Sequence, residues 1–115
     1  MFVSLGNHDS YPNGEEDFQV LEPAASVRQL LKFWVPQEQW DTHDKHTYYT
    51  REIPALNARV ISLNTESCDF HNLYLWGQEA DPNQQIAFIE ENLAELEQAG
   101  KLAILVGHIP DECSR

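Results

Sequence analysis

The chain has 115 residues, a length typical of one small domain or of part of a larger one. Its hydrophobic fraction of 42% is sufficient for a core, but 19 acidic against 7 basic residues give a formal net charge of -12. This acidity argues against binding to nucleic acids and against electrostatic binding to anionic membranes, because both require basic surfaces. A phosphate ester would bind only where cations supply positive charge locally.

No apolar stretch approaches the roughly 20 residues that a membrane-spanning helix needs. Met1 leads directly into the apolar FVSLG, which predicts a short buried strand over 1–5 rather than a signal peptide. Gly6 ends this strand and delivers the Asn-His-Asp sequence at 7–9 to a polar loop that contains YPNG.

Helical spacing of apolar residues predicts a helix over 24–34, followed by a connection over 35–46. The β-branched and aromatic sequences TYYTREI and ARVISLN, separated by PALN, predict a hairpin-like pair of strands over 47–53 and 58–64. TESCDFHNLYLWGQEA at 65–80 is a long, partly aromatic loop, and loops of this length are more often functional than idle.

The next helix has the clearest signals in the chain: Asp81 as its cap, Pro82 near its first turn and Gly100 at its end. The continuous apolar run KLAILVGHIP then predicts a buried strand, and a buried strand after an amphipathic helix predicts an α/β layered sheet. The buried face of the helix is expected to comprise Ile86, Ile89, Leu93 and Leu96.

Two apolar strands are thus predicted to end alike, in VSLGNH and ILVGH, each with a glycine and then an imidazole. In open α/β sheets, ligands bind at the carboxyl ends of strands, and glycine lets the backbone approach a bound group closely. Asparagine oxygen and imidazole nitrogen are both metal ligands. Either motif alone is weak evidence, since a lone histidine is more often a turn residue, but the matching positions favour a functional site.

GNHDS followed by GHIP resembles the calcineurin-like metallophosphoesterases. The ordered set of LLKFWVPQEQW, RVISLNT, CDFHNLYLW, DPNQQIAFIEENL and GHIPDEC resembles their acid sphingomyelinase branch, and it covers nearly the whole chain. The resemblance implies an α/β fold over residues 1–115: part of a metallophosphoesterase α/β/β/α sandwich, with an incomplete mixed sheet flanked by helices.

The resemblance also implies a phosphodiesterase in which a hydroxide held between two divalent metal ions, expected to be zinc, attacks phosphorus. Asn7 and His108 would be ligands of the second metal ion. His8 would be the general acid that protonates the departing alkoxide, and Asp9 would orient His8. Sphingomyelin-type phospholipids are the expected substrates. The alternatives are a phosphoesterase for nucleotides or other phosphoesters, and a catalytically inactive fragment or pseudoenzyme.

Counting alone allows Cys68 and Cys113 to be two free thiols or a disulfide. In the acid sphingomyelinase branch, cysteines in such positions are paired. The resemblance therefore implies a bridge between the long loop and the segment after GHIP, and with it a secreted or lysosomal location.

The family's Asp-x-His and Gly-Asp motifs before GNH, and its Gly-His-x-His motif after GHIP, do not occur in this sequence. Three or more ligands per metal is the norm, so the chain carries only part of the metal site. We therefore expect an internal fragment of a larger enzyme, without the flanking parts of its own domain, and we expect the isolated segment to be inactive.

Other candidate residues have simpler interpretations. Asp41 and His43 form an Asp-x-His sequence, but it follows GNHD and no apolar strand delivers it, so we interpret 41–46 as a solvated turn. His71 in the long loop is expected to be exposed, with contact to substrate as the alternative. The tryptophans are interpreted as packing residues, although Tyr74 and Trp76 would also suit a lipid-facing cleft. The sequence contains no Asn-x-Ser/Thr glycosylation site.

Overall fold

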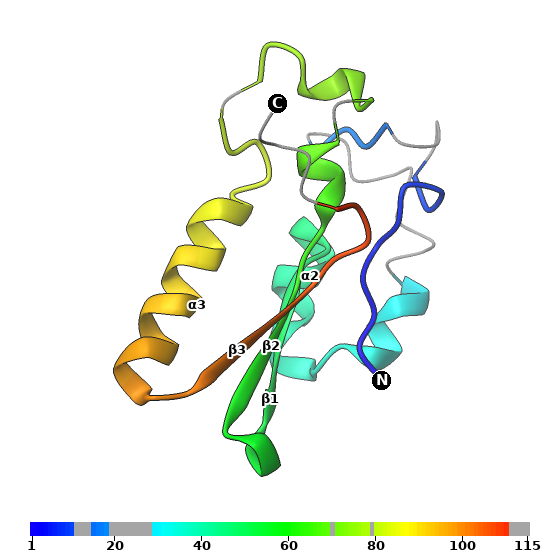
Figure 1. The fold of residues 1–115 in the computed structure, drawn as a ribbon. Helices are drawn as coiled ribbons and strands as arrows, with labels where there is room; N and C mark the ends of the chain where they lie inside the picture. The colour runs from blue at the N-terminus through cyan, green and yellow to red at the C-terminus, as the bar shows by residue number, and fades with distance from the viewer. Residues whose placement is uncertain (11–14, 19–28, 70, 79, 111–115) are drawn as a thin grey trace.

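The computed structural model describes residues 1–10, 15–18, 29–69, 71–78 and 80–110. A three-stranded sheet in the order β1-β2-β3 is formed by Tyr49–Ile53, Ala58–Ser62 and Leu102–Val106 (Figure 1). β1 and β2 pair antiparallel, whereas β2 and β3 pair parallel. Helices α2 (Trp40–His46) and α3 (Gln85–Ala99) flank this mixed sheet. The predicted α/β class is confirmed, and the arrangement is consistent with part of a metallophosphoesterase fold. Short 3-10 helices lie at Lys32–Trp34, Gln37–Gln39, Pro54–Leu56, Thr65–Cys68 and Leu73–Leu75.

The predicted hairpin is confirmed. β1 and β2 run in register from the pair Tyr49 and Ser62 to the pair Ile53 and Ala58, and Asn57 closes the connection in the left-handed region at φ 47°. Asparagine tolerates this conformation better than most residues, which suits it to the position.

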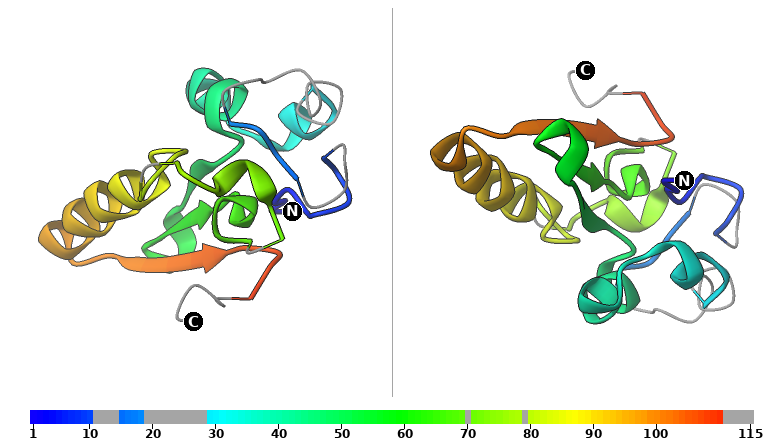
Figure 2. Two further views of the ribbon diagram at one scale, coloured as in Figure 1. Left: turned by 90° about the horizontal axis from the view of Figure 1, so that it is seen from above. Right: turned by 90° about the horizontal axis from the view of Figure 1, so that it is seen from below.

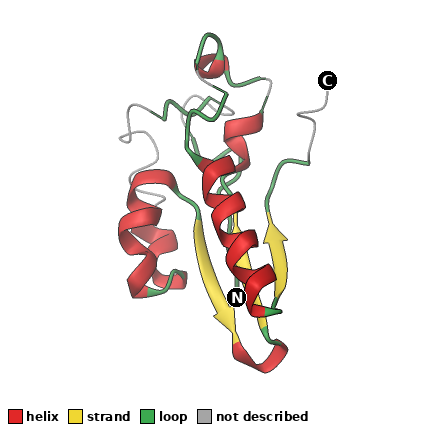
Figure 3. Cartoon of the chain, turned by 90° about the vertical axis from the view of Figure 1, so that its left-hand side faces the viewer, coloured by secondary structure: helices red, strands yellow, loops and turns green. Residues whose placement is uncertain are grey.

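α3 connects β2 to the parallel β3 and lies along one face of the sheet (Figure 2 and Figure 3). The carboxylate of Asp81 accepts hydrogen bonds from the amides of Ile86 and Ala87, at 3.0 and 3.1 Å, as expected of a cap. The helix itself begins at Gln85 with Gln84 as its N-cap, so the prediction that it starts at Asp81 and Pro82 is wrong. Gly100 ends the helix in the left-handed region at φ 63°, as predicted. In the part of the chain that is described, no helix has the length and apolarity to span a bilayer.

The predicted buried face of α3 is largely wrong. Leu96 is 2% exposed, but Ile86 and Leu93 are 50% and 39% exposed, and the helix instead buries the polar Gln85 and Asn92. The reason is hydrogen bonding to the sheet: Asn92 accepts from Arg59 of β2 at 2.8 Å. A polar residue can occupy an inward position when a partner there satisfies it.

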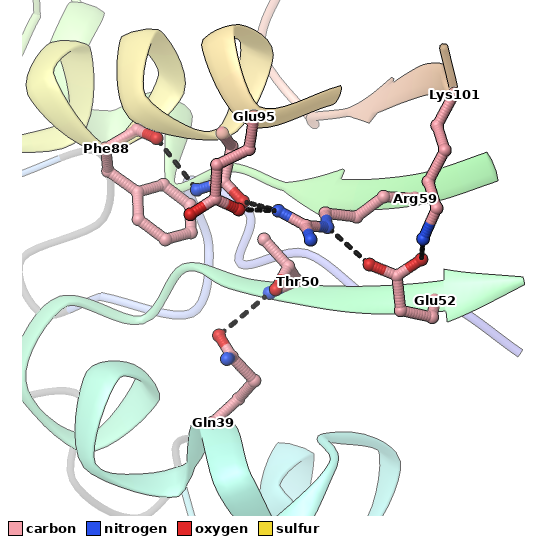
Figure 4. A network of polar contacts seen from close by, with 8 residues as sticks. Gln39, Thr50, Glu52, Arg59, Phe88, Glu95 and Lys101 are labelled. Atoms are coloured by element: carbon pink, nitrogen blue, oxygen red, sulfur yellow. Dashed lines mark hydrogen bonds and ion pairs between the residues drawn. The ribbon is translucent and has the colours of Figure 1, made fainter. Parts of the chain in front are cut away.

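Figure 4 shows this polar network between α3 and the strands. The Arg59 guanidinium donates to Glu95 of α3 at 2.8 Å and to Glu52 of β1 at 2.6 Å, and Lys101 also reaches Glu52, at 3.1 Å. Hydrogen bonding to Arg59 is the main reason why the pKa of Glu52 is lowered. On the other side of β1, the side chain of Gln39 accepts from the amide of Thr50 at 3.2 Å. Arg59 therefore ties two strands and a helix together.

β3 forms where the sequence predicts a strand, but the prediction that it is buried is wrong. Leu102 and Leu105 are 67% and 53% exposed. Within the described residues β3 pairs only with β2, and Ile86 and Ile89 of α3 lie beside its carboxyl end. A hollow of about 430 Å³ therefore opens between the start of α3 and the end of β3.

Residues 1–5 are not a strand, contrary to prediction. The carbonyl of Val3 accepts from the hydroxyls of Tyr49 and Ser62 at 3.0 and 2.6 Å, and the Val3 amide donates to Tyr49 at 3.0 Å. Side chains thus take the place of a neighbouring strand. Tyr49 and Ser62 are register partners on the face opposite to Arg59, so this segment covers the side of the sheet that α3 leaves open.

The expected helix over 24–34 is described only from residue 29, where residues 29–31 are helical and a 3-10 turn continues to residue 34.

The expected connection contains α2, and the interpretation of 41–46 as a solvated turn is wrong. His43 is 0% exposed and packs edge-to-face on Tyr49, because it lies on the side of α2 that faces β1. His46 stacks on the ring of Tyr48 at 4.9 Å.

A buried polar layer lies beneath the loop that follows β2. The amide and carbonyl of Asn64 bond the Gln85 side chain at 2.6 and 3.1 Å, and the Asn64 side chain donates to Glu16 at 2.8 Å. Glu66 is 0% exposed, and neither of its carboxylate oxygens has a hydrogen-bond partner among the described residues. Burial raises the pKa of Glu66 to about 7, and the negative charges of Asp69, Glu16 and Asp9 add to this effect.

This raised pKa predicts a stability that depends on pH. Because the pKa of Glu66 is about 7 in the folded chain and near 4.5 in the unfolded chain, its contribution is fully present below pH 4.5 and is lost as pH rises through 7. Glu66→Gln keeps the shape without the charge. We expect it to raise the free energy of unfolding by roughly 1–3 kcal/mol at pH 8 and to change it little at pH 4.5.

Urea unfolding at both pH values measures this difference, and Glu90→Gln on the exposed side of α3 is the matched control. An equal effect of Glu66→Gln at the two pH values would contradict the assignment.

Candidate functional site

Three loops meet at one edge of the sheet. Because β2 and β3 are parallel, their carboxyl ends lie at the same end of the sheet. The loop that begins at Leu63 therefore emerges beside the loop that begins at Gly107. The amide of Leu63 bonds the carbonyl of Val106 at 2.8 Å and continues the pairing up to this edge. The N-terminal segment crosses the opposite face of the sheet and brings Gly6 and Asn7 to the same place.

Asn7 and His108, the two metal ligands implied by the resemblance, are in direct contact. His108 Nε2 lies 3.0 Å from Asn7 Oδ1, although the residues are 101 positions apart in the sequence. A Cβ on Gly6 would lie 3.1 Å from the His108 ring, so glycine lets the imidazole pack on the backbone. Asn7 and His108 therefore lie side by side, while their role as metal ligands stays a prediction.

Thr65 also belongs to this site, and the sequence reasoning missed it. Its Oγ1 accepts hydrogen bonds from the amides of His108 and Ile109, at 3.3 and 2.9 Å. The signal was present in RVISLNT, since the residue after a strand that is parallel to β3 must lie near the end of β3. Reading β2 and β3 as parallel neighbours would have placed Thr65 beside His108.

His8 and Asp9 lie in a tight turn. The carboxylate of Asp9 accepts from the amide of Gly6 at 2.9 Å, and the Asp9 amide donates to the Gly6 carbonyl at 2.9 Å. His8 is exposed at this turn. Asp9 thus fixes the backbone that carries Asn7 and His8, while its role in orienting the His8 ring stays a prediction.

A hollow of about 290 Å³ lies against the contact between Asn7 and His108. Asp69 is 6% exposed, and its carboxylate contacts His71 twice, at 2.9 Å to the amide and 3.1 Å to Nδ1. The His71 side chain is 70% exposed, as expected, but it also faces the same hollow as His108. The described residues around the hollow are Asn7, Cys68, Asp69, His71, His108, Ile109 and Pro110.

Two donor atoms of types that can bind metal ions lie side by side in this site. Asn7 and His108 offer one amide oxygen and one imidazole nitrogen, which are ligand types that divalent metals accept. Among the described residues, no group of three or more His, Cys, Asp or Glu side chains could hold a metal ion. The described residues thus provide two neighbouring donors of ligand type, and whether they bind a metal ion stays a prediction.

The remaining predicted residues have mixed outcomes. Cys68 is exposed, and Cys113 lies outside the described residues, so the pairing of the two cysteines stays a prediction. Trp76 is 75% exposed and Tyr74 is 43% exposed, so packing is the wrong interpretation for Trp76. Whether the two rings face lipid stays a prediction.

Curated relatives match nearly the whole chain, whereas no family model matches it. Sphingomyelin phosphodiesterase B of Dictyostelium discoideum is 33% identical over 115 residues, which cover 96% of this chain and 18% of the relative. Human acid sphingomyelinase-like phosphodiesterase 3b is 29% identical over 117 residues, with 96% and 24% covered. Human cyclic GMP-AMP phosphodiesterase SMPDL3A is 28% identical over 111 residues, again with 96% and 24% covered.

The matched region is thus a quarter or less of the length of these relatives. All three bear the names of phosphodiesterases, and the resemblance to the acid sphingomyelinase branch is confirmed. By sequence, the chain is homologous to one segment of the acid sphingomyelinase-like phosphodiesterases.

Proposed function

We propose that this chain is a segment of a metal-dependent phosphodiesterase, with sphingomyelin-type phospholipids as its substrates. The observation that carries the proposal is the contact of 3.0 Å between Asn7 Oδ1 and His108 Nε2. Both atoms have lone pairs, so their contact requires a proton on Nε2. A metal ion that bound both atoms would take the place of this proton.

The charge of the chain favours metal-assisted chemistry. A formal net charge of -12 repels a phosphodiester, and the buried carboxylates near the site do not offset this repulsion. Two divalent ions, expected to be zinc, would neutralise the phosphate and lower the pKa of a water molecule when bound. Asn7 and His108 would supply two of their ligands.

The other site residues would move and position the proton. His8 would donate a proton to the departing alkoxide oxygen, and Asp9 would hold the imidazole in the orientation that this transfer needs. Asp9 already fixes the turn that carries His8 through its bond to the Gly6 amide. His71 and Asp69 face the same hollow and would contact the part of the substrate that lies away from Asn7.

The relative named cyclic GMP-AMP phosphodiesterase SMPDL3A supports a second candidate, a phosphodiesterase that acts on nucleotides. The two candidates share the chemistry of the phosphodiester and differ in the group that leaves. Release of phosphocholine from sphingomyelin distinguishes the first from the second.

We expect the protein that carries this segment with its flanking sequence to hydrolyse bis(p-nitrophenyl) phosphate when zinc is present. The 115-residue chain alone should not do so, because its described residues hold only part of a metal site. Translation of the flanking DNA should find Asp-x-His and Gly-Asp motifs upstream and Gly-His-x-His downstream. Zinc-dependent turnover by the isolated chain would contradict this expectation, and absence of the motifs would favour an inactive fragment.

Changing His8→Ala in the longer enzyme should lower kcat by about 100-fold or more for an ester with a poor leaving group. The loss should be much smaller for a p-nitrophenyl ester, whose leaving group needs no proton. Metal content per protein is the control and should stay unchanged. Equal losses for the two esters would remove His8 from the role of general acid.

We further propose that Cys68 and Cys113 form a disulfide and that the protein is secreted or lysosomal, as the resemblance implies. Under denaturing conditions without a reductant, iodoacetamide should label neither cysteine, and after reduction it should label both. Mass spectrometry of the intact chain measures this directly. Labelling of both thiols before reduction would disprove the bridge.

A further inference from the structure

The hydroxyl of Thr65 links the loop after β2 to the loop after β3. Its Oγ1 accepts from two consecutive amides, those of His108 at 3.3 Å and Ile109 at 2.9 Å. Two hydrogen bonds to one oxygen fix the path of the backbone that carries the His108 side chain. The direction of the imidazole therefore depends on a residue that belongs to another loop.

Close packing confines the same loop from two sides. A Cβ on Gly107 would lie 2.7 Å from the methyl group of Thr65, so the chain passes Thr65 as closely as only glycine permits. On the other side, a Cβ on Gly6 would lie 3.1 Å from the His108 ring. His108 is exposed, and its ring is packed on one side, against the backbone at Gly6.

Thr65 is itself held by rigid neighbours. It is the first residue of the 3-10 helix Thr65–Cys68. The side-chain oxygen of the preceding Asn64 caps this helix by accepting a hydrogen bond from the backbone amide of Glu66 at 3.2 Å. Asn64 is 0% exposed. The Gln85 side chain of α3 forms hydrogen bonds with the backbone amide and the backbone carbonyl of Asn64. A β-branched side chain on such a backbone has few accessible rotamers.

We propose that Thr65 is a positioning residue, which holds His108 so that its Nε2 faces Asn7 Oδ1. The importance of this position for catalysis rests on the proposed function, in which His108 is a metal ligand. The contact between His108 and Asn7 does not depend on the proposed function, so the effect of Thr65 on it can be tested in the 115-residue chain alone.

The first experiment compares three variants of the 115-residue chain by NMR. Thr65→Val removes the hydroxyl and keeps the shape of the side chain, whereas Thr65→Ser keeps the hydroxyl. Thr50→Val makes the same change from threonine to valine on β1, away from the site, and serves as the matched control. In the wild type, Thr65→Ser and Thr50→Val, we expect nuclear Overhauser effects between the His108 ring and the α-protons of Gly6.

In Thr65→Val these signals should disappear, and the Ile109 amide should exchange with solvent about tenfold faster relative to the amides of β2. Gly107→Ala displaces the Thr65 side chain from the opposite direction and should have the same effect at His108, which keeps the test decisive if Thr65→Val does not fold. Retention of the contacts between His108 and Gly6 in either folded variant would overturn the proposal.

The second experiment measures kinetics in the longer protein that carries the segment. Thr65→Val should lower kcat for bis(p-nitrophenyl) phosphate by about 10- to 100-fold, because a displaced ligand misplaces the reacting groups. Thr65→Ser should restore most of the loss, and Thr50→Val should resemble the wild type. If the wild type is active and Thr65→Val has the same kcat, the positioning role is overturned. An inactive wild type defeats the proposed function instead, and the NMR result still decides whether Thr65 orients His108.

Discussion

The parallel pairing of β2 with β3 is the constraint on which the candidate site depends. It brings the loops that follow two separate strands to the same end of the sheet, so that Thr65 and His108 become neighbours. Parallel pairing needs a crossover, and α3 provides it, held to the sheet by Arg59. The position of the imidazole is thus determined by the same hydrogen bonds that stabilise the fold.

The acidity of the chain continues into its interior. Glu16, Glu66 and Asp69 are buried beside the loops that form the site, and the Glu66 oxygens have no hydrogen-bond partner within the described residues. Burial, together with the nearby charges of Asp69, Glu16 and Asp9, raises the pKa of Glu66 to about 7, so the interior favours the protonated form of this one carboxyl. The fold therefore loses stability as pH rises through the pKa of Glu66.

Local signals in the sequence predicted local structure well. The hairpin between β1 and β2 and the end of α3 at Gly100 depend on neighbouring residues, and both are confirmed. Asp81 does bind a first-turn amide of α3, but it does so from a position before the N-cap. The meeting of Asn7 with His108 was also expected, since each follows an apolar segment with a glycine.

The features that were missed depend on contacts between distant residues. α2 forms around His43, which packs on Tyr49 of β1, and no local pattern indicates that partner. Residues 1–5 have the composition of a strand, but the hydroxyls of Tyr49 and Ser62 bind the backbone of Val3 where a neighbouring strand was expected. The inward face of α3 is polar because Arg59 lies opposite Asn92, and Thr65 matters only because Ile109 lies beside it.

The exposed side of β3 has a consequence for handling the chain in the laboratory. Leu102 and Leu105 belong to β3, and the outer edge of this strand has no neighbour in the described part of the molecule. Such an edge is a template on which another extended segment can add, and the apolar side chains favour that addition. At high concentration, copies of the chain should associate into oligomers through this edge, and a charged substitution at Leu102 should keep preparations monodisperse.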